Sequence, residues 1–126
     1  METLLKSMDL DFLSTGKHKI TAEKMFKNKE AVLLDVRTTQ EVEALTINTN
    51  TLGIPTLNIP VDQIPHRLSE LPNNKLIAIF CPHNSRSGIT YAYLKAKGFS
   101  NCKILVGGYA SLTAEINPKK LLASTE

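Results

Sequence analysis

The chain of 126 residues is poor in cysteine and in aromatic residues: it has two cysteines, no tryptophan and 6% aromatic residues. Cys81 and Cys102 form neither a C-x-x-C pair nor a spacing suited to zinc ligands, so no metal site is expected. So few cysteines favour a reducing compartment, where a single thiol can act chemically. We therefore expect a cytoplasmic protein.

The chain also lacks a large excess of charge of either sign and long apolar segments. The 15 lysine and arginine residues outnumber the 12 acidic residues by a net charge of only +3. No basic stripe is interleaved with aromatics, so nucleic acid is not an expected partner. Residues 1–9 contain no uninterrupted apolar segment, which predicts neither a signal peptide nor a membrane span. With 42% hydrophobic residues, the composition is that of one soluble globular domain.

Short apolar runs that alternate with helical patterns make up most of the chain. Strands are predicted at His18–Ile20, Ala31–Val36, Thr56–Ile59, Lys75–Phe80 and Lys103–Val106. Helices are predicted at Leu4–Phe12, Ala22–Lys27, Thr39–Leu45, Val61–Leu71, from near Ser87 with Ile89, Ala92, Tyr93 and Ala96 on one face, and at Tyr109–Ile116. This alternation predicts an α/β fold, with a mostly parallel central sheet of about five strands and helices on both faces. We divide the chain into a lead-in (1–17), one domain (18–117) and a tail (118–126) that we expect to be frayed.

Local capping signals support several of these boundaries. Thr21 stands before a helix as an N-cap, and Thr38 with Glu41 has the spacing of a capping box. Gly98 follows a helix as its C-terminal stop. The polar, unpatterned segment Thr46–Gly53 is predicted to be a loop.

The most informative segment is Cys81–Ser87, which follows the apolar run Leu76–Phe80 and precedes a helix. Its cysteine is expected at the carboxyl end of a strand, where open α/β sheets bind their ligands. The unpaired N–H groups at the start of the next helix stabilise negative charge and favour a nucleophilic thiolate. Arg86 adds a fixed positive charge and a planar fork of donors suited to oxyanions.

The length of this loop bears on its ligand. The stretch from Cys81 to Arg86 can wrap into a semicircle with its N–H groups pointing inward, which forms an anion nest around the sulfur. Such a nest suits either a phosphoryl group or the terminal sulfur of a persulfide. Only four residues separate Cys81 from Arg86. This tight loop fits one additional sulfur atom, whereas cysteine phosphatases have a longer loop, so its length favours sulfur.

Several segments, taken together and in order, carry a resemblance to a known family. They are Leu33–Arg37 with Glu41, Leu57–Val61, Ile64–Pro72, Phe80–Ser87, Gly98–Phe99 and Leu105–Gly108. In these segments the chain resembles a single-domain rhodanese, a thiosulfate sulfurtransferase-like protein, over residues 18–115. The resemblance implies the rhodanese-like version of the α/β fold predicted above.

The resemblance also implies a reaction and its residues. Cys81 would take a sulfane sulfur from a donor, become a persulfide and pass the sulfur to a thiophilic acceptor. Arg86 would help to hold the donor's oxyanion. The substrate-binding loop would further comprise His83, Asn84, Ser85 and Ser87. Expected partners are a small anionic donor, such as thiosulfate or a persulfide, and a thiol or cyanide acceptor, with a sulfur-relay protein as a further candidate; no metal or organic cofactor, nucleic acid or membrane is implied.

Supporting residues and one departure complete this interpretation. Asp35 and Arg37 are expected to form a structural charge pair beneath the loop. His83 either tunes the thiolate and moves protons or points to solvent, and the sequence leaves both possibilities open. The family's usual Gly-His-Ile segment is absent, and Thr51–Gly53 stand in its place after a longer loop.

Two other functions remain compatible with the sequence. The first is a non-catalytic rhodanese-like module that senses sulfur or redox state or docks a partner, which would acquire sulfur without turnover. The second is a small cysteine phosphatase or arsenate reductase, which would use the same nucleophile but is disfavoured by the short loop.

Overall fold

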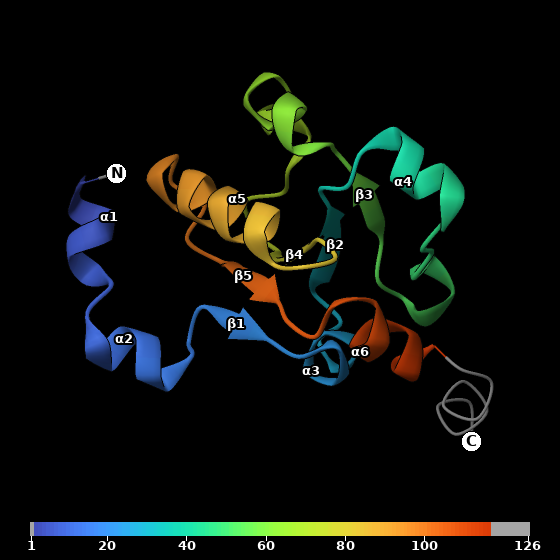
Figure 1. Cartoon of the computed structure of the whole chain (residues 1–126), viewed down its shortest axis with the longest axis horizontal. Coiled ribbons are helices and arrows are strands. Elements are labelled where there is room, and N and C mark those ends of the chain that lie inside the picture. Colours follow the sequence, from blue (N-terminus) through green and yellow to red (C-terminus); the bar gives the residue numbers. More distant parts are fainter. Residues whose placement is uncertain (1, 117–126) are drawn as a thin grey trace.

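A computed structural model describes residues 2–116 of the chain. Its five-stranded sheet has the order β1-β5-β4-β2-β3, and each neighbouring pair is parallel (Figure 1). The strands are β1 (Lys19–Ile20), β2 (Ala31–Asp35), β3 (Thr56–Asn58), β4 (Leu76–Phe80) and β5 (Cys102–Leu105). The helices are α1 (Glu2–Ser7), α2 (Leu10–Thr15), α3 (Ala22–Lys27), α4 (Thr39–Ala44), α5 (Ser85–Ala96) and α6 (Gly108–Glu115), with 3₁₀ turns η1 (Asn50–Leu52), η2 (Val61–His66) and η3 (Leu68–Glu70). The predicted α/β class with a parallel five-stranded sheet is confirmed.

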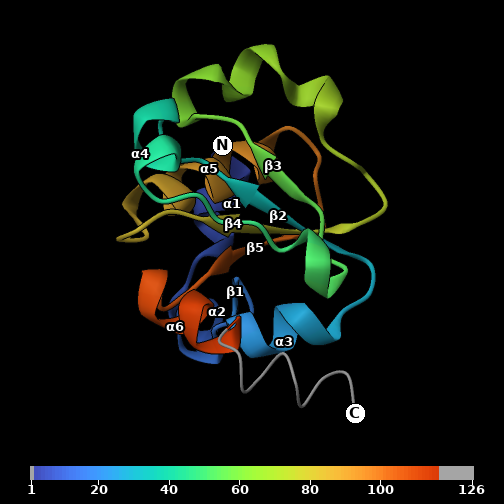
Figure 2. The same cartoon turned by 90° about the vertical axis from the view of Figure 1, so that its right-hand side faces the viewer.

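Helices cover both faces of the sheet (Figures 1 and 2). Strands β2 and β4 are buried along their whole length, which explains their continuous apolar sequences. Successive side chains alternate between two clusters. One cluster contains Leu34 and Ile79 and packs against Leu94 of α5. The other contains Leu33 and Phe80, and it packs against α3 and α6.

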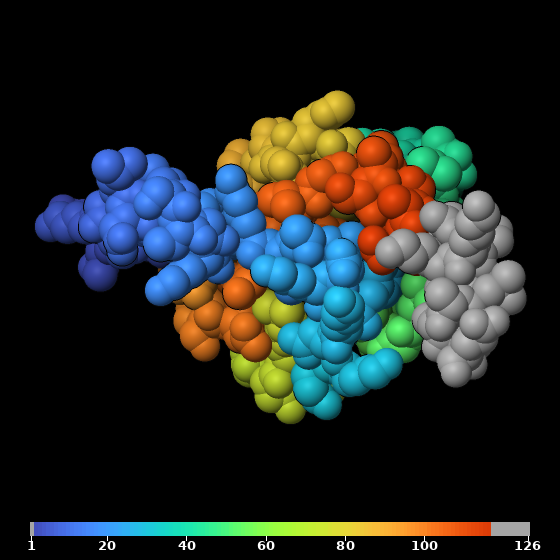
Figure 3. All heavy atoms as spheres, turned by 90° about the horizontal axis from the view of Figure 1, so that it is seen from below, coloured from blue at the N-terminus to red at the C-terminus, as the bar shows by residue number. Residues whose placement is uncertain are grey.

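The lead-in forms two short helices rather than the single helix predicted over Leu4–Phe12. The break falls near Asp9, whose side chain caps α2 by accepting the Phe12 N–H at 3.0 Å. A capping carboxylate favours a new helix start over continuation of the first helix. Met8 and Phe12 pack against the cluster on the α5 side of the sheet, while α1 and α2 project from the domain (Figure 3).

The prediction of an α-helix over Val61–Leu71 is wrong, because this segment forms the two 3₁₀ turns η2 and η3. Pro65 lies inside η2 and cannot donate a backbone hydrogen bond. It also disfavours the α conformation of the residue before it. The apolar spacing of Ile64, Leu68 and Leu71, which suggested an α-helix, therefore belongs to short 3₁₀ turns, and η2 buries Ile64.

The helix after Cys81 begins at Ser85, two positions before the predicted start. Its buried residues are Ser87, Thr90, Tyr91 and Leu94, which recur at helical spacing. Ile89, predicted on one face with Ala92, Tyr93 and Ala96, is 66% exposed. The buried face includes two polar residues, Ser87 and Thr90, so hydrophobic periodicity did not identify it. Ile89 instead lines an apolar pocket with Val61, Ile64 and Pro65.

The capping predictions are confirmed. Thr21 accepts the Lys24 N–H, and Thr38 with Glu41 forms a complete capping box at α4. The predicted loop Thr46–Gly53 contains the turn η1 and buries Thr49, whose hydroxyl bonds the Ile54 carbonyl at 2.6 Å. The predicted tail, 118–126, lies outside the described residues. Within residues 2–116, no helix has the length and apolar character needed to cross a bilayer.

Candidate active site

Cys81 follows β4 directly and faces the N-terminus of α5. Its side chain has no exposed surface. The Ser87 N–H donates to Cys81 Sγ at 3.2 Å, and the thiol donates to Ser87 Oγ at 3.3 Å. Among the amides from His83 to Ser87, in the described part of the chain, the Ser87 amide is the one that donates to the sulfur. The sulfur therefore lies against the first turn of the twelve-residue helix α5.

The intervening residues His83, Asn84 and Ser85 are exposed. Asn84 is the N-cap of α5 and has a left-handed backbone with φ of 65°, a conformation that asparagine tolerates better than most residues. Its side chain makes no capping hydrogen bond. This turn reverses the chain between β4 and α5 and brings Ser87 back to the cysteine.

Gly108, at the start of α6, presses closely on the same loop. A Cβ atom at Gly108 would lie 2.7 Å from the Pro82 carbonyl oxygen, which is closer than side chains approach backbone atoms. Its φ of +56° also favours glycine. Gly108 thus allows α6 to pack against the cysteine loop.

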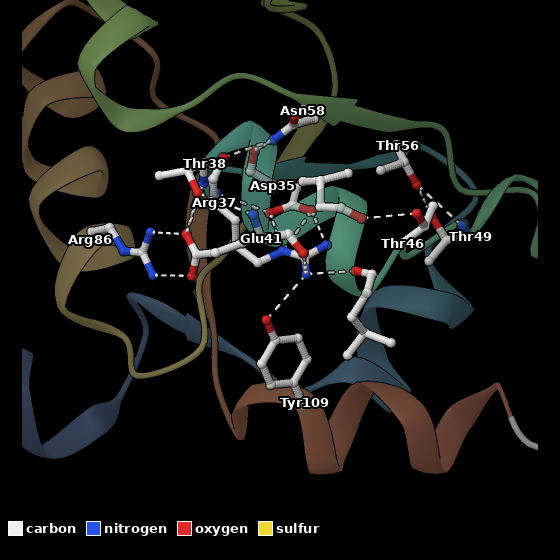
Figure 4. A network of polar contacts seen from close by, with 12 residues as sticks. Asp35, Arg37, Thr38, Glu41, Thr46, Thr49, Thr56, Asn58, Arg86 and Tyr109 are labelled. Atoms are coloured by element: carbon white, nitrogen blue, oxygen red, sulfur yellow. Dashed lines mark hydrogen bonds and ion pairs between the residues drawn. The ribbon is translucent and has the colours of Figure 1, made fainter.

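Asp35 and Arg37 form a buried ion pair at the end of β2 (Figure 4). Arg37 Nη2 donates to Asp35 Oδ2 at 2.7 Å, and Arg37 Nε donates to Oδ1 at 2.9 Å. Neither side chain has more than 2% of its surface exposed. The expected pairing of these two residues is therefore present, in an arrangement in which each charge is compensated.

Arg37 also joins elements that are far apart in the sequence. Its Nη1 donates to the Leu45 carbonyl at 2.8 Å, just beyond α4, and to the Tyr109 hydroxyl at 3.2 Å, on α6. The guanidinium carbon lies 5.6 Å from the centre of the Phe80 ring and 5.5 Å from that of Tyr109, within range of a cation–π attraction. Arg37 thereby holds α4 and α6 around the residue that precedes Cys81.

Arg86 is bound to Glu41 rather than free. Arg86 Nη1 and Nη2 donate to Glu41 Oε1 and Oε2 at 2.6 and 2.9 Å, a bidentate pair between the start of α5 and α4 (Figure 4). The hydrogen bonds from Arg86, followed by that from the Thr38 amide, lower the pKa of Glu41 to about 2. The hydrogen bonds to Glu41 raise the pKa of Arg86. The loop's positive charge is therefore paired before any ligand arrives.

The sequence interpretation missed three contributors to this site. Tyr109 and Gly108 come from α6, which approaches the loop only in the folded sheet. Asn58 ends β3 and donates from Nδ2 to the carbonyls of Asp35 and Arg37 at 2.9 and 3.1 Å. Asn58 and Gly108 lie in the segments Leu57–Val61 and Leu105–Gly108 that carried the resemblance. The contacts of all three residues, however, depend on the order of the strands.

The chain matches the model of the Rhodanese-like domain over residues 20–115. Fold and site together define a parallel α/β domain with a cysteine loop between a central strand and a helix, and this chain belongs to the rhodanese-like family. The sequence-based resemblance is confirmed.

Individual relatives agree with this assignment. A protein named sulfurtransferase from Allochromatium vinosum is 29% identical over 87 residues, which span 69% of this chain and 76% of that protein. The structure of a rhodanese-related protein from Thermoplasma volcanium aligns with a TM-score of 0.64 at 27% identity, covering 80% of this chain and 95% of that one. A NAD-dependent persulfide reductase from A. fulgidus aligns with a TM-score of 0.60 at 29% identity over 82% of this chain, which corresponds to 19% of the reductase.

Proposed function

We propose that this protein is a rhodanese-type sulfurtransferase that works through a persulfide on Cys81. In the first half-reaction the Cys81 thiolate attacks the sulfane sulfur of the donor. With thiosulfate, the donor's S–S bond breaks and sulfite leaves with the electron pair. With a persulfide RSSH, the thiolate RS⁻ leaves and the proton stays on the transferred sulfur. An acceptor such as cyanide then attacks the terminal sulfur, forms thiocyanate and returns the Cys81 thiolate.

The observation that carries this proposal is the hydrogen bond from the Ser87 amide to Cys81 Sγ. It orients the sulfur toward the N-terminus of α5, where backbone N–H groups stabilise a thiolate or a persulfide anion. Cys81, Ser87 and the exposed loop residues between them form the proposed substrate site. The sulfurtransferase name of the relative from A. vinosum supports the same class of reaction.

The proposed roles of the other site residues follow from their positions. Arg86 acts on the donor from the first turn of α5, and Asp35 with Arg37 supports the loop from below without touching the substrate. His83, Asn84 and Ser85 are exposed, and we assign them as the residues that an arriving donor or acceptor would contact. A small anionic donor, a thiol or cyanide acceptor and a sulfur-relay protein in the cytoplasm are the proposed partners.

The complete burial of Cys81 favours a second candidate function. A sulfur with no exposed surface can exchange with a donor only when the loop opens. A module that senses sulfur or redox state would acquire sulfur slowly under these conditions and would not pass it on. Turnover separates this candidate from the transferase.

The test is to incubate the protein with thiosulfate or glutathione persulfide and to measure its intact mass and the thiocyanate formed on addition of cyanide. We expect one added sulfur atom and repeated turnover. Cys81→Ala should abolish both, whereas Cys102→Ala is the matched control, because burial raises the pKa of the Cys102 thiol to about 11 and keeps it protonated. Sulfur addition without turnover would support the sensor, and undiminished turnover of Cys81→Ala would refute both functions.

A further inference from the structure

The Glu41 carboxylate is held in place before it meets Arg86. Its Oε1 accepts the Thr38 N–H at 2.9 Å and the Thr38 hydroxyl at 3.1 Å, while the Glu41 N–H donates to Thr38 Oγ1 at 3.2 Å. This capping box fixes the carboxylate at the first turn of α4. Glu41 is therefore a preorganised acceptor for Arg86, and not a mobile surface acid that happens to lie nearby.

Arg86 directs the two terminal nitrogens of its guanidinium at this carboxylate. These are the groups that would form a bidentate contact with the sulfonate end of a donor. Both side chains of the pair are about one third exposed, at 30% and 33%, so the pair lies at the surface where a donor can reach it. Arg86 directly precedes Ser87, whose amide donates to the reacting sulfur.

Each of the two arginines, Arg86 and Arg37, is therefore paired with a carboxylate. Glu41 neutralises Arg86, and Asp35 neutralises Arg37. Thiosulfate, with two negative charges, must either displace Glu41 from Arg86 or bind beside its carboxylate, and both are unfavourable. A protonated persulfide has a neutral reacting end and needs neither change.

We propose that Glu41 determines donor specificity: by occupying Arg86 it selects persulfide donors over thiosulfate. This inference rests on the sulfur-transfer function proposed above. It assigns a role to Glu41 that goes beyond capping α4, because Glu41 touches the one arginine of the loop from across the site. A donor of higher negative charge is disfavoured by the carboxylate.

The test compares Glu41→Gln with wild type in steady-state assays with thiosulfate and with glutathione persulfide. Glutamine keeps the capping box, which accepts either Glu or Gln, and removes the charge. The KM for thiosulfate should fall about tenfold, because one unit of repulsion near a dianion disappears. The KM for glutathione persulfide should change less than about twofold. Glu43→Gln, on the exposed side of the same helix, is the matched control and should behave as wild type.

Each outcome bears on the inference. A Glu41→Gln variant with an unchanged or higher KM for thiosulfate, or with equal changes for both donors, would overturn it and leave Glu41 as a structural anchor of Arg86. Wild type provides an arm that does not depend on the folding of a variant: a lower KM for thiosulfate than for glutathione persulfide also overturns the inference. Absence of any sulfur on Cys81 with either donor, in every variant, would refute the transferase function itself.

Discussion

The buried ion pair between Arg37 and Asp35 gives the sharpest prediction about stability. The substitution Arg37→Met keeps the apolar stem of the side chain and removes its charge. Asp35 then loses three hydrogen bonds from the guanidinium, with lengths of 2.7, 2.9 and 3.1 Å, and retains one from the Arg37 backbone N–H. Since the Asp35 carboxylate stays buried without its partner, the free energy of unfolding should fall by about 3–5 kcal/mol. This is a large part of the roughly 5–15 kcal/mol that stabilises a typical domain.

The assay is equilibrium unfolding in urea, followed by circular dichroism. Arg67→Met is the matched control, because Arg67 and Glu70 form an ion pair whose side chains are 34% and 45% exposed. Removing that pair should cost less than about 1 kcal/mol. If Arg37→Met also lowered the free energy of unfolding by less than about 1 kcal/mol, the reasoning would be refuted. The buried ion pair would then stabilise the protein no more than a surface ion pair does.

The double variant Asp35→Asn/Arg37→Met tests the cause of this loss. A neutral amide is cheaper to leave without its partner than a carboxylate, so the double variant should be more stable than Arg37→Met alone. Strict additivity of the two single substitutions would show that the charges act independently, contrary to the geometry of the pair.

Three further outcomes follow from the same contacts. Gly88→Ala should raise the free energy of unfolding by about 0.5–1 kcal/mol, seen as a higher Tm, because within residues 2–116 nothing beyond the adjacent residues and the helix's own backbone lies within 4 Å of the added Cβ. Gly108→Ala should lower both the Tm and the rate of sulfur addition, because its Cβ meets the Pro82 carbonyl; wild-type rates in this variant would show that the loop adapts. Glu41 has a pKa of about 2 in the folded protein against 4.5 for an ordinary glutamate, so its contribution is complete above about pH 4.5 and is lost as the pH falls through 2. Urea midpoints measured between pH 5 and pH 2 should therefore fall less steeply for Glu41→Gln than for wild type.

The central part of the fold could be predicted from local sequence because it depends on local rules. Strands β2 and β4 are short apolar runs, and a sheet covered on both faces requires that pattern. The capping box at α4 involves residues three positions apart and needs no tertiary information. The cysteine between a buried strand and a helix was recognisable for the same reason.

Other parts depend on contacts that the sequence does not display. Leucine spacing suggested one helix over 61–71, but the backbone restriction imposed by Pro65 prevailed over that spacing. The buried stripe of α5 includes Ser87 and Thr90, and hydrophobic periodicity does not identify polar residues as buried. The pairing of Arg86 with Glu41 joins residues 45 positions apart, so it appears only once α4 and α5 are placed on the sheet.

Arg37 is linked to the cysteine loop through Glu41, whereas Arg86 belongs to the loop itself. The effects of changing Arg37 and of changing Glu41 should therefore be separable. Arg37 donates to the carbonyls of Glu41 and Leu45, at 3.4 and 2.8 Å, and so positions α4. Glu41 in turn binds Arg86, one residue before the Ser87 amide that donates to the sulfur. Loss of Arg37 should therefore move the loop and reduce sulfur addition from every donor alike. Loss of the Glu41 charge leaves α4 capped but releases Arg86 from its ion pair, so its effect should follow the charge of the donor.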